Sequence, residues 1–283
     1  MFKAMLLQQW HNLSDPELDE SLRVRLDFML FTGFELLEEI PDETTICRFR
    51  NKLTELRLEK KLFEEINGQL EKLGLKVKQA DGAVIDATII ESSAKPNRII
   101  EMSIDRQESI QTDLREDTHM SMNIKESADP DARWLKKGKK SYFGYKGFIS
   151  TEVLDGYIMA VHVTSANESE CNKLEQFLEH PRGTRIYADK GYASGDNTMK
   201  VKQRGLKDGI MQKASRGHAL TFWQKLRNKL ISKKRFIVEQ AFGTLKRMFE
   251  FTRSRYMSRV KVEAQMVWKA MCLNLLKASN KAQ

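Results

Sequence analysis

The sequence predicts an α/β protein in which a small all-helical region, residues 1–78, precedes a larger domain, residues 79–283, built on a mixed β-sheet with flanking helices. The first region repeats its apolar residues at helical spacing. Residues 83–90 read AVIDATII, an apolar and β-branched run typical of a buried central strand. Asp155-Gly156 separates two strand-like stretches, which predicts a hairpin.

The helical region carries recognisable start signals. The segment from Ser14 to Glu17 has the spacing of a capping box with a proline in the first turn. Asp42 or Thr44 is expected to cap a later helix that carries Arg48 and Arg50. A helix that opens with polar residues after a tight turn and presents two arginines suits a DNA groove. An ordinary helical bundle explains the same pattern, so both interpretations stay open.

The larger domain alternates strands and helices. The predicted strands are residues 83–90, 142–153, 157–164, 184–188 and 208–211, and the predicted helices are 168–179, 220–251 and 261–278. Residues 92–131 are polar and lack aromatic residues, so we expect an inserted loop or a partly disordered segment there, and with the basic run that follows the insertion extends over about 92–140. A strand, an insertion, a hairpin and β-α-β crossovers follow in the order of the RNase H-like fold.

Composition excludes several classes of protein. With 283 residues and 41% hydrophobic residues, the chain is able to bury a core, so a fully disordered protein is excluded. No apolar run approaches the roughly 20 residues that span a bilayer. The three cysteines, Cys47, Cys171 and Cys272, are isolated, which argues against a disulfide framework and a cysteine zinc site. We therefore expect a protein of the reducing cytoplasm.

Charge is distributed unevenly along the chain. The net charge is +9, but the segment from Arg182 to Lys281 holds 24 basic and 6 acidic residues, a net charge of +18. Such asymmetry indicates that the last third of the chain meets a polyanion. A solvated basic surface would give the same count, so the few acids inside this basic segment are the more informative residues.

Two of the candidate acids lie on predicted strands. Asp86 sits in the middle of the apolar strand, where a buried carboxylate is costly unless it pairs with a Lys or Arg or binds a metal. Asp189 closes a second strand, at the end where α/β sheets usually place their ligands. Each acid alone is more often structural than catalytic, and only their combination with a third acid favours a catalytic role.

The third acid is Glu239, on the long predicted helix. At about 100° per residue, Arg235, Glu239, Gly243 and Lys246 share one face, which suits the close approach of a phosphate and a metal or of the sheet. Three carboxylates are able to hold two divalent cations, which activate the attacking oxygen and stabilise the leaving one at phosphorus. Oxygen ligands suit Mg²⁺ best.

These residues lie in segments that resemble a known family, the DDE transposases of bacterial insertion sequences, in the IS-five group. The matching segments are PDETTICRFRNKL at 41–53, VIDATII at 84–90, DARWLKKGKKSYFGYKGF at 131–148, VTSANESE at 163–170, YADKGY at 187–192, RFIVEQAFGTLKR at 235–247 and KAMCLNLLKA at 269–278. Together they span nearly the whole chain.

The resemblance implies an RNase H-like catalytic domain that uses Mg²⁺, with Mn²⁺ as an alternative, to cleave and join double-stranded DNA at the terminal inverted repeats of the element. The family's catalytic and metal-binding acids fall on Asp86, Asp189 and Glu239. The residues predicted to contact DNA are Arg235, Lys246, Lys136, Lys137, Lys139, Lys140, Lys146, Arg48 and Arg50. A homodimer or larger assembly is implied when two DNA ends are brought together, and a nucleoid-associated, cytoplasmic location is expected.

Three departures from the family pattern leave alternatives open. Ser232 stands where a related pattern has Tyr, and Phe148 stands where relatives often have His. Relatives usually have a further segment ahead of the residues that match the start of this chain. A truncated, non-catalytic DNA-binding derivative, acting as an inhibitor or a remnant, is therefore the second hypothesis, and a stand-alone nuclease of the same fold is the third.

Overall fold

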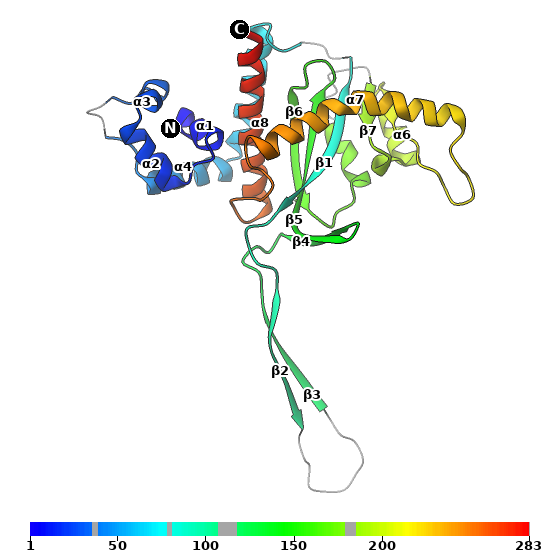
Figure 1. The fold of residues 1–283 in the computed structure, drawn as a ribbon, viewed down its shortest axis with the longest axis horizontal. Helices are drawn as coiled ribbons and strands as arrows, with labels where there is room; N and C mark the ends of the chain where they lie inside the picture. The colour runs from blue at the N-terminus through cyan, green and yellow to red at the C-terminus, as the bar shows by residue number, and fades with distance from the viewer. Residues whose placement is uncertain (36–38, 78–80, 107–117, 179–184, 283) are drawn as a thin grey trace.

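A computed structural model describes residues 1–35, 39–77, 81–106, 118–178 and 185–282. Five helices come first and a mixed sheet with further helices follows (Figure 1). The helices are α1 (Phe2–Trp10), α2 (Asp15–Val24), α3 (Leu26–Thr32), α4 (Glu43–Glu55), α5 (Leu58–Lys72), α6 (Gly195–Gln203), α7 (Phe222–Arg247) and α8 (Arg259–Ala282). In the part of the chain with described structure, no helix is both long and apolar enough to cross a membrane.

The predicted helix starts are confirmed. The Ser14 hydroxyl accepts a hydrogen bond from the N–H of Glu17, and the Glu17 carboxylate accepts one from the N–H of Ser14. Asp42, rather than Thr44, caps α4 by accepting from the N–H of Thr45 at 2.7 Å. These contacts satisfy backbone donors that the first turn of a helix leaves unpaired.

A single mixed sheet organises the second part of the chain. Its strands are β1 (Ala83–Glu91), β4 (Arg133–Lys137), β5 (Lys140–Glu152), β6 (Ile158–Ser165), β7 (Arg185–Ala188) and β8 (Lys207–Ile210). The order runs β4-β5-β1-β7-β8, with β6 also paired to β5. Strands β5 and β6 are antiparallel to their neighbours, whereas β1, β7 and β8 run parallel. This arrangement confirms the predicted RNase H-like fold class.

Within the insertion at about 92–140, the prediction of a loop or partly disordered segment at 92–131 is wrong for the residues that the structure describes, and residues 107–117 lie outside them. The structure has the strands β2 (Arg98–Arg106) and β3 (Thr118–Lys125), which pair with each other as an antiparallel ribbon that projects from the body of the molecule (Figure 1). The polar composition concealed a period-two pattern, IEMSID in residues 100–105 and MSMNIK in residues 120–125. The last part of the segment forms β4, the partner of β5.

Two helix predictions also need correction. The segment predicted as a helix at 168–179 forms a short 3₁₀ helix, Cys171–Phe177. Side chains take carbonyls that an α-helix would use: the amine of Lys146 donates to the carbonyl of Glu168, and the amide of Asn197 donates to that of Cys171. The helix predicted at 220–251 is α7, which ends at Arg247, four residues earlier than predicted.

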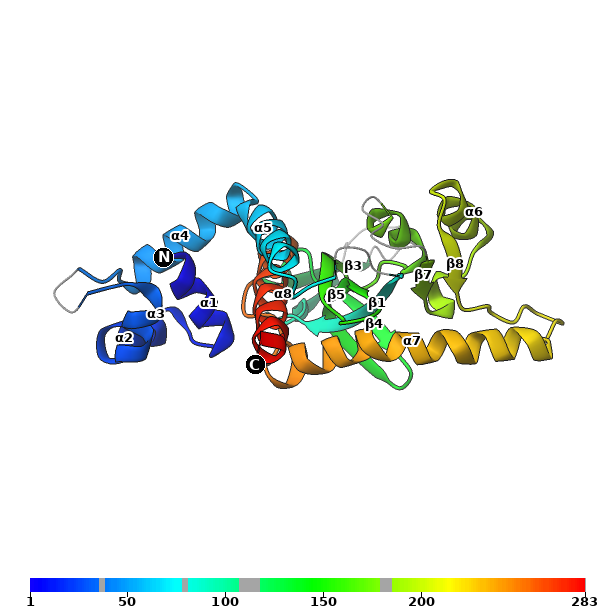
Figure 2. The same cartoon turned by 90° about the horizontal axis from the view of Figure 1, so that it is seen from above.

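Two hydrophobic cores hold the layers together. One face of the sheet packs against α7 and α8, and this core continues into the first helices, where Phe2 meets Trp268 and Trp10 meets Phe249. The other face packs against the 3₁₀ helix and α6. Viewed from above, α7 crosses the sheet and its N-terminal half extends beyond it (Figure 2). The long helix is therefore placed to deliver side chains to the sheet and to solvent.

Candidate active site

Two of the predicted acids are brought side by side by the register of the sheet. In the parallel pairing of β1 with β7, Ile85 lies opposite Ala188. Asp86 and Asp189 are the next residues of the two neighbouring strands. Because side chains alternate between the faces of a sheet, both carboxylates point to the face covered by α7. Two like charges on adjacent strands require a cation nearby.

The cation is supplied by Arg235, from the middle of α7. Its Nη2 donates to Oδ2 of Asp86 at 2.6 Å, and its Nη1 lies 3.5 Å from Oδ1 of Asp189. The Arg235 side chain is 11% exposed, against 16% for Asp86 and 33% for Asp189. One guanidinium therefore bridges two carboxylates that are far apart in the sequence, and Arg235 is the basic partner of Asp86, one of the two kinds of partner expected for that buried acid.

The surroundings make ionisation of Asp86 unfavourable. Burial raises the pKa of Asp86, the charge of Asp189 adds to the rise, and Arg235 together with the N–H of Ala87 offsets only part of it. Tyr192, behind Asp189, has a pKa well above its usual value because it is buried and faces Asp86 and Glu170. Burial is thus the main reason why the charged form of Asp86 is disfavoured, and Arg235 offsets it only in part.

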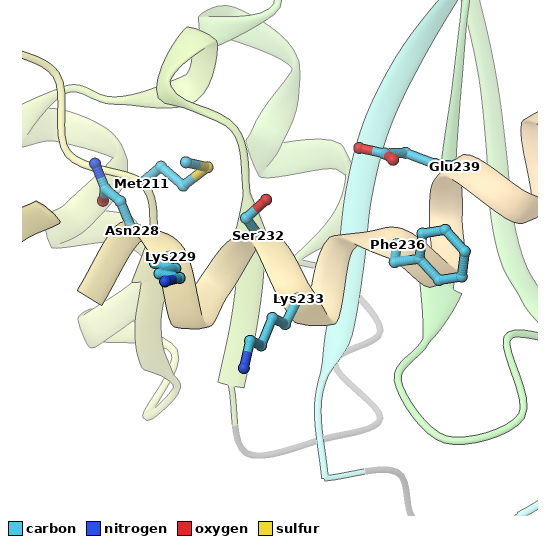
Figure 3. Close-up of a pocket in the computed structure, with 7 residues that line it drawn as sticks. All are labelled: Met211, Asn228, Lys229, Ser232, Lys233, Phe236 and Glu239. Carbon is cyan, nitrogen blue, oxygen red and sulfur yellow. The ribbon is translucent and has the colours of Figure 1, made fainter. Parts of the chain in front are cut away.

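Glu239 lies one helical turn beyond Arg235 but is exposed. It lines an open pocket of about 580 Å³ on α7, together with Met211, Asn228, Lys229, Ser232, Lys233 and Phe236. Figure 3 shows Glu239 and Ser232 projecting from the same edge of the helix, with Lys233 on the other edge. Across the residues that were placed, no three His, Cys, Asp or Glu side chains are grouped closely enough to hold a metal ion. The predicted convergence of all three acids is therefore not present in this conformation.

A basic track leads away from these residues. Lys136, Lys137, Lys139 and Lys140 are all exposed at the tip of the β4–β5 hairpin, where Gly138 adopts the φ of 62° that the tight turn requires. The tip lies close to the end of α7, since burial and the charge of Lys137 both lower the pKa of Lys246. Lys137 and Lys246, predicted from two distant segments, thus lie within electrostatic range of each other.

Three other residues predicted to contact DNA lie in different surroundings. Arg48 is exposed on α4. Arg50, which is 8% exposed, pairs with Asp15 and lies over the ring of Tyr256. Lys146 is 7% exposed, and its amine donates to a backbone carbonyl at 2.6 Å. The contacts of Arg50 and Lys146 are structural, because both charged groups are already engaged inside the protein.

Two of the three departures from the family pattern, Phe148 and Ser232, have different consequences. Phe148 is fully buried and packs near Phe177 and His162 on the opposite face of the sheet from Asp86. It therefore lies in the core and does not line the acid site. Ser232 is exposed in the open pocket beside Glu239, where a larger side chain would have room.

Sequence reasoning assigned no role to the buried Tyr192 or to Glu170, whose side chain is 33% exposed. Both residues belong to the quoted segments YADKGY and VTSANESE. A Cβ on Gly191 would come within 2.9 Å of Oε2 of Glu170, so a larger residue in the turn after Asp189 would make that flexible carboxylate shift. Gly191 and Tyr192, which follow Asp189 in YADKGY, were the sequence signal for a tight turn with a buried aromatic residue next to this acid.

The donor set suits a hard divalent cation. Asp86 and Asp189 provide carboxylate oxygens, the ligand type that Mg²⁺ prefers, and their shared negative charge already attracts one cation, the guanidinium of Arg235. Glu239 is able to add a third carboxylate only if its side chain turns from the open pocket toward the sheet. Asp86 and Asp189 therefore suit a metal by ligand type and placement, with the guanidinium of Arg235 lying between them in this conformation.

Comparison with known proteins agrees with this geometry. Residues 78–275 match the family described as "Transposase DDE domain", and residues 1–52 match a second family described as "Transposase domain". The chain is 44% identical over 235 residues to a transposase for insertion sequence element IS1106 of Neisseria meningitidis serogroup B. That match covers 83% of this chain and 77% of the relative. The chain therefore belongs to the DDE transposases of insertion sequences, enzymes that act on DNA with divalent metal ions.

Proposed function

We propose that this protein binds the terminal inverted repeats of an insertion sequence, cleaves the DNA there and joins the released end to target DNA. The observation that carries the proposal is the pairing of Asp86 with Asp189 beneath α7, with Glu239 one turn beyond the bridging Arg235. A chain that holds acids in this arrangement next to a basic track is suited to chemistry on a polyanion.

In this proposal Asp86, Asp189 and Glu239 would hold Mg²⁺ or Mn²⁺. Such ions supply charge neutralisation and an activated oxygen for in-line displacement at phosphorus. Because Glu239 is exposed, its side chain has to turn toward the sheet to reach the metal ions. The open pocket that it lines leaves space for this movement. Burial beneath α7 keeps water away from Asp86, which strengthens its interaction with any cation.

The basic track positions the DNA. Lys246 grips a phosphate near the reacting end, and the hairpin lysines Lys136, Lys137, Lys139 and Lys140 extend the contact along the backbone. Arg48 contributes from α4, whereas Arg50 and Lys146 act indirectly, by holding the elements in place. At least two copies of the chain assemble when two DNA ends are brought together. The cleavage and joining of DNA take place at the bacterial nucleoid.

The experiment uses the full chain and a labelled duplex that carries a terminal repeat, with Mg²⁺. We expect the unmodified chain to nick the duplex, Glu239→Gln to bind it without nicking, and Lys246→Ala to lose both affinity and rate. Lys225→Ala, an exposed lysine near the start of the same helix, is the matched control for a change of charge on α7.

Two results would contradict the proposal. If the unmodified chain binds the repeat but never nicks it, the non-catalytic derivative is the better description. If Glu239→Gln nicks as fast as the unmodified chain, Glu239 has no place in the mechanism.

A further inference from the structure

Arg235 occupies the interval between the two aspartates. Its two terminal nitrogens engage a different carboxylate each, at 2.6 Å for Asp86 and 3.5 Å for Asp189. A divalent cation that binds oxygens of both acids needs the same space. The guanidinium and the metal ion also repel each other, because both are positive and the surroundings are largely buried.

Simple addition of a metal is therefore unfavourable, and the guanidinium has to move. A displaced arginine needs a new anion, since a buried and unpaired charge is costly. Within the described ranges, the ion pairs of Arg235 are those with Asp86 and Asp189. Its remaining contact is a weak one, from Nη1 to the sulfur of Met211 at 3.8 Å, and its buried Nε has no hydrogen-bond partner.

A phosphate fits what a displaced Arg235 lacks. The planar guanidinium presents paired N–H groups, and a phosphate accepts two of them at once. Ser232 and Glu239, which line the open pocket, lie about one helical turn before and after Arg235 on α7. A change of side-chain rotamer is therefore enough to carry the guanidinium from the acids toward the exposed edge of the helix. That edge leads to Lys246 and the hairpin lysines, which follow the proposed DNA backbone.

We propose that Arg235 is a positioning residue that couples metal binding to DNA binding. It competes with the metal for Asp86 and Asp189, and a DNA phosphate relieves the competition by taking the guanidinium. Metal and DNA therefore bind with positive coupling, and the coupling is reciprocal. This inference rests on the proposed function, because it requires a phosphate to reach the helix edge.

The test measures binding of Mn²⁺ to the full chain at pH 8 by the electron paramagnetic resonance signal of the free ion. Each protein is titrated alone and with a short duplex of arbitrary sequence, after subtraction of the Mn²⁺ that the duplex binds by itself. The variants are Arg235→Gln and Arg235→Lys. The matched control is Arg227→Gln, an arginine of the same helix that donates to the carbonyls of Asp208 and Ile210 instead of bridging the acids.

Without DNA, we expect Arg235→Gln to bind Mn²⁺ at least about tenfold more tightly than the unmodified chain, equal to about 1.4 kcal/mol. With DNA, the unmodified chain should gain a similar factor and Arg235→Gln much less. Arg235→Lys keeps the charge but loses the bridge, so its affinity should lie between the two. Arg227→Gln should match the unmodified chain in both conditions.

Unchanged or weaker Mn²⁺ binding by Arg235→Gln and Arg235→Lys without DNA would overturn the proposal, because Arg235 would then support the metal site. If Arg235→Gln does not fold, as judged by its circular dichroism, the Arg235→Lys titration decides in the same way. If the unmodified chain binds DNA but gains no Mn²⁺ affinity, the coupling is wrong while the proposed function stands. If no variant binds DNA at low salt, both the coupling and the proposed function fail.

Discussion

Two arginine–aspartate pairs in this molecule have almost the same geometry and opposite electrostatics. Arg50 meets Asp15 at 2.5 Å among the first helices, and Arg235 meets Asp86 at 2.6 Å under α7. Burial works to raise the pKa of Asp15, but hydrogen bonds from Arg50 and Gln8 outweigh it and the pKa falls. At Asp86 burial prevails and the pKa rises. An ion-pair distance alone therefore does not tell a structural pair from an active-site pair.

What differs is the number of acids that each arginine serves. Arg50 has one carboxylate, with Gln8 donating to the same group and the ring of Tyr256 against the guanidinium. Arg235 is shared between two carboxylates, and the burial of Asp86 outweighs its contribution there. The first pair has one guanidinium for one carboxylate. The second site has one guanidinium for two carboxylates and therefore suits the binding of a further cation.

The largest expected difference between the two pairs is in catalysis. Asp86→Asn should lower the rate of strand cleavage by at least about 10²–10³-fold, the range for losing one electrostatic stabiliser in an active site. Asp15→Asn should keep the rate per folded molecule, because Asp15 lies among the first helices, remote from the sheet's acids. Single-turnover cleavage of labelled repeat DNA, normalised to folded protein, makes the comparison. Equal losses for both variants would remove the distinction.

The Arg50–Asp15 pair should matter for stability instead of for catalysis. Arg50→Met leaves the Asp15 carboxylate without its main partner, and we expect a loss of about 2 kcal/mol in the free energy of unfolding. This is less than the about 3–5 kcal/mol of a fully buried pair, because Asp15 keeps some contact with water. The matched control is Arg48→Met, on the exposed side of the same helix, which should change stability by no more than about 0.5 kcal/mol.

Urea unfolding with a DNA-binding assay separates the two arginines. Arg48→Met should weaken DNA binding at unchanged stability. Arg50→Met should lower the stability and leave the DNA affinity of the folded protein unchanged. A stability loss as large for Arg48→Met as for Arg50→Met would contradict the assignment.

The pH dependence of stability should have opposite signs at the two aspartates. The pKa of Asp15 is lower in the folded chain, so its ionised form contributes stability above pH 3.8, and this contribution is lost as the pH falls through the folded value. The pKa of Asp86 is higher in the folded chain, so stability is favoured below pH 3.8 and declines as the pH rises through the folded value.

Variants isolate each contribution. In buffer with a chelator, the stability of Asp86→Asn relative to the unmodified chain should improve as the pH rises from 3.8, whereas that of Asp15→Asn should worsen as the pH rises toward 3.8. Urea melts across pH 3 to 6 measure both differences. Curves with the same sign would show that Arg235 compensates Asp86 as fully as Arg50 compensates Asp15.

Much of this comparison follows from the sequence, and part of it does not. Asp86 inside an apolar strand was a clear signal, and the strand register then fixes Asp189 beside it. Arg48 and Arg50 were both assigned to DNA, although two residues along a helix are about 200° apart and rarely face the same surface. Helical geometry alone therefore argued that one of them points inward, and only the packing shows that it is Arg50.

Other features depend on tertiary structure that local patterns do not encode. The carbonyls that Lys146 and Asn197 take from the 3₁₀ helix come from different elements, so helical spacing in that segment misled. The projecting ribbon was missed because its polar composition was given more weight than its period-two alternation. The bridge from Arg235 to both acids depends on how α7 crosses the sheet, which spacing along one helix cannot predict.

The smallest expected effect tests whether the face of α7 beyond Arg235 is open for a ligand. A Cβ on Gly243 would meet only the guanidinium of Arg247 within 4 Å, at 3.4 Å, and no atom of the sheet. The sheet therefore does not require this glycine, which corrects one of the two reasons expected for it. Gly243→Ala should stabilise the helix by about 0.5 kcal/mol, less than the mid-helix value of about 1 kcal/mol, because α7 ends soon afterwards.

If DNA passes over this face, Gly243→Leu should lower the affinity for duplex DNA about tenfold while keeping the stability at or above that of the unmodified chain. Stability and affinity then move in opposite directions, as they would not if the glycine served packing. Thr244→Leu places the same bulk one residue further along the helix and is the matched control. Equal DNA affinity for Gly243→Leu and the unmodified chain would show that the DNA takes another path, and the negative charge of the Arg235 site would then need a different ligand.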